Sequence, residues 1–134
     1  MNIALMAHDN KKELMVQFRT AYCGILAKHT LCATASTGQQ IADATGLTIH
    51  RFLSFTHGGG QQIAARIAYN EIDMVLFFSD PQSSDLDPDL KYINQMCDQY
   101  NIPFATNAAT AEILIHGLER GDLDWRNIVN PGNR

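Results

Sequence analysis

Charge is scarce in this chain, and it is not arranged to bind polyanions. Only 18% of the 134 residues are charged, and ten Lys and Arg against 14 Asp and Glu give a net charge of −4. No run of basic residues occurs, although a protein that binds nucleic acid or an anionic membrane needs clustered positive charge. We therefore expect no nucleic acid and no membrane among its partners.

Cysteines and long apolar runs are equally scarce. Cys23, Cys32 and Cys97 are odd in number and form no C-x-x-C pair, which argues against a disulfide framework and against a zinc site. The longest apolar run, 74–78, is far shorter than the roughly 18 residues that a membrane helix needs. No basic segment followed by an apolar run marks the start as an export signal. We expect a soluble protein of the reducing cytoplasm, without a metal.

Short apolar runs alternate along the chain with helical patterns, which is typical of strands buried on both faces and joined by helices. The hydrophobic fraction of 46% suits a substantial core. We expect strands near 3–7, 30–33, 49–53, 74–78 and 103–106, and helices near 11–28, 37–45, 60–70, 88–100 and 108–118. The pattern predicts a single α/β domain over 1–134, with three layers and helices on both faces of a five-stranded parallel sheet. The glycine- and asparagine-rich tail from Gly117 is expected to run along the surface.

Polar residues follow every expected strand, at the sheet edge where open α/β folds bind ligands. These segments are His8 to Lys12, Thr34 to Gln40, Ser54 to Gln62, Ser79 to Asp89 and Thr106 to Thr110. Taken alone, each segment also has a simpler interpretation: a helix cap after most strands, a flexible loop for the glycine stretch, and a solvated turn for the acidic stretch. Together they place hydroxyls, glycines, lysine, histidines and carboxylates at one edge. That combination predicts a site for a small phosphorylated ligand and acid–base chemistry.

Collinear motifs show that the chain resembles the methylglyoxal synthase family from about residue 2 to residue 118. They are Ile-Ala-Leu-Met-Ala-His-Asp-x-x-Lys (3–12), Ala-Thr-Ala-Ser-Thr-Gly (33–38), Leu-Ser-x-x-x-Gly-Gly-x-Gln-Gln (53–62), Ile-Asp-x-x-x-Phe-Phe-x-Asp-Pro (72–81), Asp-Pro-Asp (87–89) and Ile-Pro-x-Ala-Thr-Asn-x-Ala-Thr-Ala (102–111). The resemblance implies a flavodoxin-like or Rossmann-like domain that assembles as a homohexamer. It also implies a lyase that converts dihydroxyacetone phosphate into methylglyoxal and inorganic phosphate, without a metal or organic cofactor.

The resemblance also implies roles for individual residues. The substrate- and phosphate-binding residues that it implies are His8, Asp9, Lys12, Thr34, Ser36, Thr37, Gly38, Ser54, Gly58 and Gly59. Asp80 and Asp89 are implied near the reacting carbons. The family carries an Asp, its catalytic base, at the position of Gly60. His57 is a candidate replacement, because an imidazole accepts a proton near neutral pH.

Further departures from the family lie beside this position. Leu86 stands where the family has a His, and Phe55 stands where it has a Gly next to the phosphate. Asp85 and Asp89 are alternative bases, and Arg126 or Arg134 is the candidate for the family's C-terminal arginine. Two functions therefore stay open: a divergent lyase, and a catalytically silent relative that binds a phosphorylated metabolite or phosphate as a regulatory or sensing module.

Overall fold

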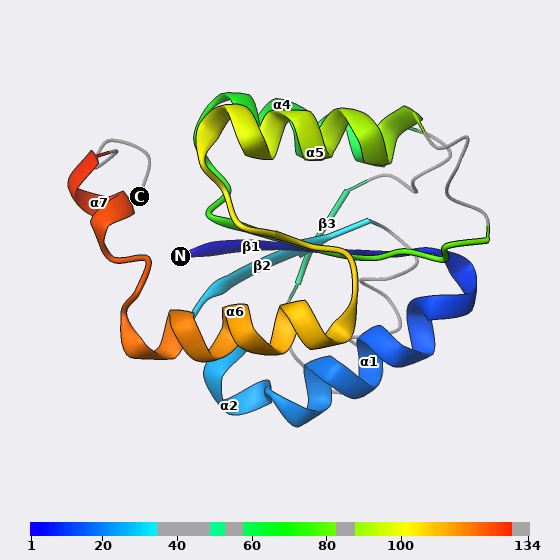
Figure 1. The fold of residues 1–134 in the computed structure, drawn as a ribbon, viewed down its shortest axis with the longest axis horizontal. Coiled ribbons are helices and arrows are strands. Elements are labelled where there is room, and N and C mark those ends of the chain that lie inside the picture. Colours follow the sequence, from blue (N-terminus) through cyan, green and yellow to red (C-terminus); the bar gives the residue numbers. More distant parts are fainter. Residues whose placement is uncertain (35–48, 53–57, 83–87, 130–134) are drawn as a thin grey trace.

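A parallel sheet forms the middle layer of the molecule. The computed structural model describes residues 1–34, 49–52, 58–82 and 88–129 (Figure 1). The strands of this part are β1 (Asn2–Ala7), β2 (Thr30–Ala33), β3 (His50–Arg51), β4 (Met74–Phe78) and β5 (Phe104–Ala105). They form a five-stranded sheet of order β3-β2-β1-β4-β5 in which every pair is parallel, so the predicted fold class is confirmed. β5 begins only after Pro103, which has no N–H to donate to the ladder.

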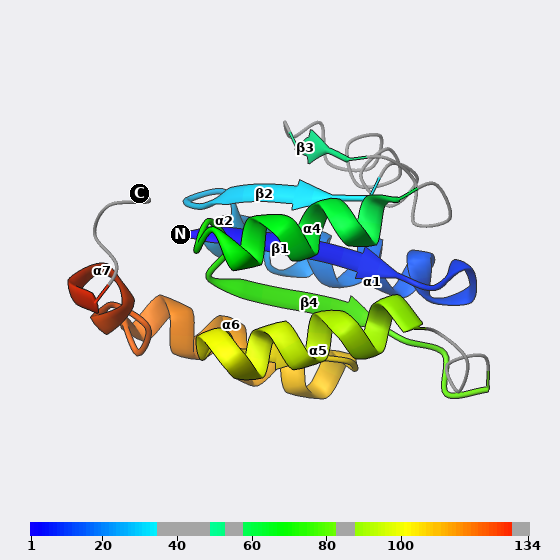
Figure 2. The ribbon, with the colours of Figure 1, turned by 90° about the horizontal axis from the view of Figure 1, so that it is seen from above.

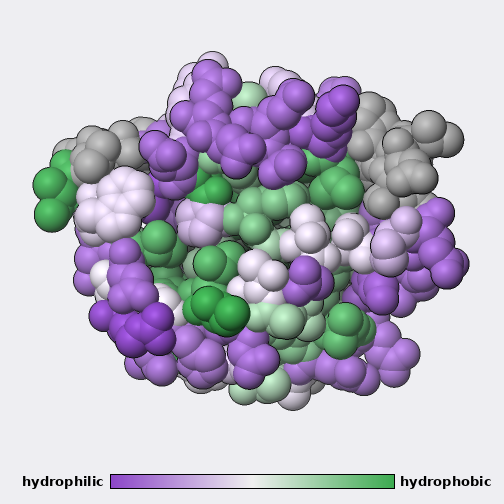
Figure 3. All heavy atoms as spheres, viewed as in Figure 1, coloured by the Kyte–Doolittle hydropathy of each residue, from purple (hydrophilic) through white to green (hydrophobic). Residues whose placement is uncertain are grey.

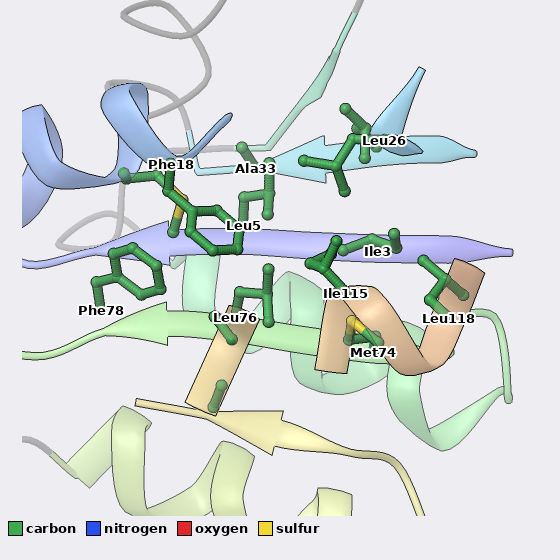
Figure 4. Packing of buried hydrophobic residues seen from close by; sticks show 14 of the residues in the cluster. Ile3, Leu5, Phe18, Leu26, Ala33, Met74, Leu76, Phe78, Ile115 and Leu118 are labelled. Carbon is green, nitrogen blue, oxygen red and sulfur yellow. The ribbon is translucent and has the colours of Figure 1, made fainter. Parts of the chain in front are cut away.

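The central strands are almost entirely apolar because helices cover both faces of the sheet. Figure 1 shows α4 (Gly59–Ala68) and α5 (Pro88–Tyr100) on one face, and α1 (Lys12–Ala21), α2 (Cys23–Leu26) and α6 (Ala108–Arg120) on the other. Side chains alternate between the faces along a strand. Ile3 and Leu5 of β1 therefore join the core under α1 and α6, shown in Figure 4, whereas Ala4 and Met6 join the core under α4 and α5.

The helix expected over 11–28 is divided in the structure. A 3₁₀ turn, η1 (Asp9–Lys11), precedes α1, and the chain leaves helical geometry at Tyr22 before α2 begins. Two residues weaken the helix there. The Thr20 hydroxyl donates to the Val16 carbonyl oxygen at 2.8 Å, a bond that bends helices, and Gly24 is a poor helix former. The helix expected near 37–45 lies outside the described residues.

The composition of the C-terminal segment predicted that it would run along the surface, but part of it is buried in the protein. α6 continues to Arg120 and ends at Gly121, whose φ of 85° is left-handed, and a short helix, α7 (Trp125–Val129), follows. Arg126 of α7 is completely buried and pairs with the buried Asp73 just before β4, with 3.1 Å between Nε and Oδ1. This buried ion pair attaches the segment to the amino-terminal edge of the sheet.

Candidate functional site

The site lies where the chain changes direction across the sheet. From β1 the chain proceeds to β2 and β3 on one side, and it then crosses over to β4 and β5 on the other. The carboxyl ends of β1 and β4 therefore flank a topological switch point, which is where open α/β sheets form a ligand-binding crevice. His8 follows β1 directly, and its N–H donates to the Phe78 carbonyl oxygen at the end of β4 (3.0 Å).

A hydrogen bond joins His8 to Asp80 across this switch point. The backbone N–H of Asp80 donates to Nδ1 of His8 at 2.7 Å, and the imidazole packs edge-on against the Phe77 ring, with centroids 5.2 Å apart. Because Nδ1 accepts a hydrogen bond, the neutral imidazole carries its own proton on Nε2. His8 is thereby prepared as a neutral hydrogen-bond donor, which suits an oxygen that gains negative charge during a reaction.

The carboxylate of Asp80 is held on both oxygens. Oδ1 accepts from the backbone N–H of Gln82 at 2.9 Å, and Oδ2 accepts from Nδ2 of Asn10 at 2.8 Å. Sequence reasoning missed both partners. Asn10 belongs to the polar stretch after β1, where a helix cap was the simple alternative, but its side chain donates to a loop 70 residues away.

A cation stands at the start of α1. Lys12 is the first residue of this helix, and its Nζ lies 2.7 Å from Oδ1 of Asp9. The hydrogen bond from Lys12 and its positive charge hold the pKa of Asp9 below its usual value, against a small opposing effect of burial. α1 continues directly from η1, where the backbone N–H of Lys12 donates to the Asp9 carbonyl oxygen, so this end carries the positive charge of Lys12 and the positive end of the helix dipole. Such an end attracts anions.

Thr34 and the glycines lie at the same edge of the sheet. Thr34 follows β2 and is only 3% exposed. Gly58 precedes α4 with a φ of 101°, a left-handed conformation that favours glycine, while the buried Gly59 and Gly60 begin the helix. Figure 2 shows this end of α4 above the carboxyl end of the sheet. Gly60 brings no carboxylate to this position.

Several predicted residues cannot be compared with the structure. Ser36, Thr37, Gly38, Ser54 and His57 lie outside the described residues, as do Phe55, Asp85, Leu86 and Arg134. Asp89 is the second residue of α5. Within the described ranges, no cluster of His, Cys, Asp and Glu has the arrangement of a metal site.

Arg126 cannot serve as a phosphate ligand of this site. Besides Asp73 it donates to the Asn101 carbonyl oxygen at 2.8 Å, and the pair lies at the amino-terminal edge of the sheet, opposite the switch point. The cysteines are likewise removed from the chemistry. Burial raises the pKa of both Cys32 and Cys97 to about 12, so neither thiol supplies a nucleophile near neutral pH.

The fold is an open α/β domain whose candidate site brings a histidine, a carboxylate and a lysine to one edge of the sheet, and the comparisons assign its family. The family model "MGS-like domain" matches residues 15–106. The chain is 61% identical over 132 residues to the methylglyoxal synthase of Caldicellulosiruptor saccharolyticus, which covers 98% of this chain and 94% of that protein. It is 56% identical over 131 residues to the methylglyoxal synthase of Geobacillus thermodenitrificans, covering 97% and 91%. The chain therefore belongs to the methylglyoxal synthase family.

A solved structure agrees with this assignment. The crystal structure of methylglyoxal synthase from Elizabethkingia anophelis matches with a TM-score of 0.80 and 39% sequence identity, over 85% of this chain and 76% of the other. In the described ranges, none of the helices has the length and apolar character needed to cross a membrane.

Proposed function

We propose that this protein is a carbon–oxygen lyase that converts dihydroxyacetone phosphate into methylglyoxal and inorganic phosphate. The observation that carries the proposal is the hydrogen bond between His8 and Asp80 at the switch point, beside a helix that begins with Lys12. It occurs in a chain that is 61% identical to a methylglyoxal synthase. The same edge thus combines an anion-attracting helix end with a neutral donor and a carboxylate.

The reaction needs a base, an oxyanion donor and a phosphate site. A base removes a proton from the hydroxymethyl carbon next to the carbonyl, which gives an enediolate. The electron pair of the enediolate then expels phosphate by breaking the bond between carbon and the bridging oxygen, and the protonated base gives its proton to the phosphate. The other product is the enol of methylglyoxal, which becomes methylglyoxal when it loses its hydroxyl proton and gains a proton on the new methylene carbon. Lys12, Thr34 and the N-terminal N–H groups of α4 bind the phosphate. Nε2–H of His8 donates to the enediolate oxygen.

The family has its catalytic base, an Asp, at the position of Gly60, so another residue of this chain has to supply the base. We propose that His57 supplies this function, with Asp80 and Asp89 beside the reacting carbons. Loss of a positioned base slows a reaction by roughly 10²- to 10⁴-fold. A His57→Ala variant should therefore release phosphate from dihydroxyacetone phosphate at least about 100-fold more slowly than the wild type. An unchanged rate would refute this assignment.

Phosphate release by the purified wild-type protein tests the function itself. A rate above the solution background supports the lyase, whereas background rate with measurable binding of inorganic phosphate supports the silent binder. The Gly60→Asp variant separates the two further. Gly60 is the second residue of α4, where a carboxylate suits the positive end of the helix dipole. In a silent binder this change should create activity at unchanged phosphate affinity, but in an active enzyme with another base it should add little.

We also propose a cytoplasmic homo-oligomer, and we infer its hexameric state from the family resemblance. In the described part, β5 pairs only with β4, so its other side is an open edge. Figure 3 shows apolar side chains between the hydrophilic surfaces of the helices at this edge, and Ile113 of α6 is 69% exposed. Light scattering should give six times the chain mass of 14.9 kDa. A mass equal to one chain would refute the assembly but not the lyase.

A further inference from the structure

Asn10 has no part in the proposed mechanism, yet its side chain lies within the site. It is the middle residue of η1, between His8 and Lys12, and its side chain is exposed. It nevertheless donates to Asp80 at the end of β4, 70 residues away, at 2.8 Å. An exposed hydrogen bond between two loops contributes little to folding stability, because water competes for both groups.

The two loops that meet here stand on a rigid base. β1 and β4 are adjacent strands, with Ala7 opposite Phe78, and the N–H of His8 continues the pairing to the Phe78 carbonyl oxygen. Asn10 and Asp80 thus extend from the ends of two strands that cannot move independently. The distance between their loops is set by the sheet.

The geometry of the bonds at Asp80 explains what Asn10 adds. Rotation of a carboxylate about its last side-chain torsion is broad. The N–H of Gln82 donates to Oδ1, which restrains one of the two carboxylate oxygens. The amide of Asn10 holds Oδ2 and fixes the plane of the carboxylate, while the backbone N–H of the same Asp80 holds His8. The hydrogen bonds of Asp80 therefore orient both its own carboxylate and the imidazole of His8.

We propose that Asn10 is a positioning residue for the lyase reaction, which it serves by fixing the orientation of the Asp80 carboxylate across the switch point. This inference rests on the proposed function, since it assigns Asn10 to the same site. This role requires no contact between Asn10 and the substrate. Its removal should slow the chemical step and leave substrate binding and folding nearly unchanged.

A double-mutant cycle tests the proposal with kcat and KM for dihydroxyacetone phosphate. Asn10→Ala should lower kcat about tenfold, the effect of losing one hydrogen bond to a charged group, and change KM by less than about twofold. In the Asp80→Ala background the same substitution should cost less than about twofold, because Asn10 acts through Asp80. The control is Asn94→Ala, an exposed asparagine of α5, which should leave both constants unchanged. Equal losses in kcat in both backgrounds would overturn the proposal.

A second measurement does not need activity. In a pH titration followed by NMR, the Asn10 side-chain amide signals should shift as the Asp80 carboxylate is protonated, and the shift should vanish in Asp80→Ala. If the wild type releases no phosphate but the amide follows Asp80, the lyase fails and the contact that orients the carboxylate stands. If phosphate is released but the Asn10 amide signals do not shift as Asp80 is protonated, the lyase stands and the positioning role is wrong.

Discussion

Replacing Asp73 with asparagine removes the negative charge from the buried pair that holds α7 to the sheet. Both side chains of the pair are 0% exposed. Asp73 accepts from Nε of Arg126 at 3.1 Å and from the backbone N–H of Asn2 at 2.8 Å. An asparagine can keep only one of these bonds. If its oxygen stays with Asn2, its amide N–H groups face the guanidinium, donor against donor.

The size of the effect follows from what remains around Arg126. Removing one partner of a buried ion pair usually costs about 3–5 kcal/mol, because the other charge stays buried without compensation. Here the guanidinium keeps its bonds to the Asn101 carbonyl oxygen at 2.8 Å and to Oδ1 of Asn70 at 3.1 Å. These acceptors offset part of the loss. We therefore expect the free energy of unfolding to fall by about 3 kcal/mol, the lower end of that range.

Urea denaturation followed by circular dichroism measures this loss, with Glu71→Gln as the matched control. Glu71 pairs with Arg66 at 2.9 Å, but the two side chains are 39% and 48% exposed, so the loss of this pair should cost less than about 1 kcal/mol. Trypsin offers a second measurement, since Arg126 should become a cleavage site in Asp73→Asn if α7 separates from the sheet. If Asp73→Asn costs no more than Glu71→Gln and leaves Arg126 protected, the buried pair does not hold α7 in place.

Three further predictions concern other parts of the fold. Arg19 is 1% exposed, and none of its three guanidinium nitrogens has a hydrogen-bond partner in the described structure. Arg19→Met should therefore raise the free energy of unfolding, measured by urea denaturation, by about 1–4 kcal/mol. A lower free energy of unfolding would contradict this prediction. An added Cβ would meet no atom within 4 Å at either Gly58 or Gly24, but φ is 101° at Gly58. Gly58→Ala should therefore lower the free energy of unfolding by about 1–2 kcal/mol, whereas Gly24→Ala should not lower it. Equal losses in the two variants would refute the backbone argument. Burial, and then the charge of the Met1 amino group, lower the pKa of His29 from 6.5, so its contribution to stability is present above that pH and is lost as the pH falls through the folded-state pKa. Denaturation should show a larger loss of stability on acidification in the wild type than in His29→Gln, and parallel losses would exclude this origin.

Patterns along the chain were sufficient to predict the bounds of strands that are buried on both faces. β2 and β4 begin and end as predicted, because strands buried on both faces are continuous apolar runs. The helix expected over 11–28 was less well predicted, since the bend at Tyr22 is favoured by a hydroxyl bond and a glycine that hydrophobic periodicity does not record. The composition of the tail was misleading. Arg126 looks like a surface residue in the sequence, and its burial depends on Asp73, 53 residues earlier.

The site divides in the same way. The order of strands and helices placed His8, Lys12, Thr34 and Asp80 at one edge of a parallel sheet, because the carboxyl ends of parallel strands all lie there. The sequence by itself therefore determined the fold class and the sheet edge at which we propose the site. Only the tertiary structure decided that the loops after β1 and β4 meet, so that Asp80 binds both His8 and Asn10. The physical reason is that hydrophobic periodicity reports how each segment is buried, whereas contacts between distant loops follow from the order in which the strands pair.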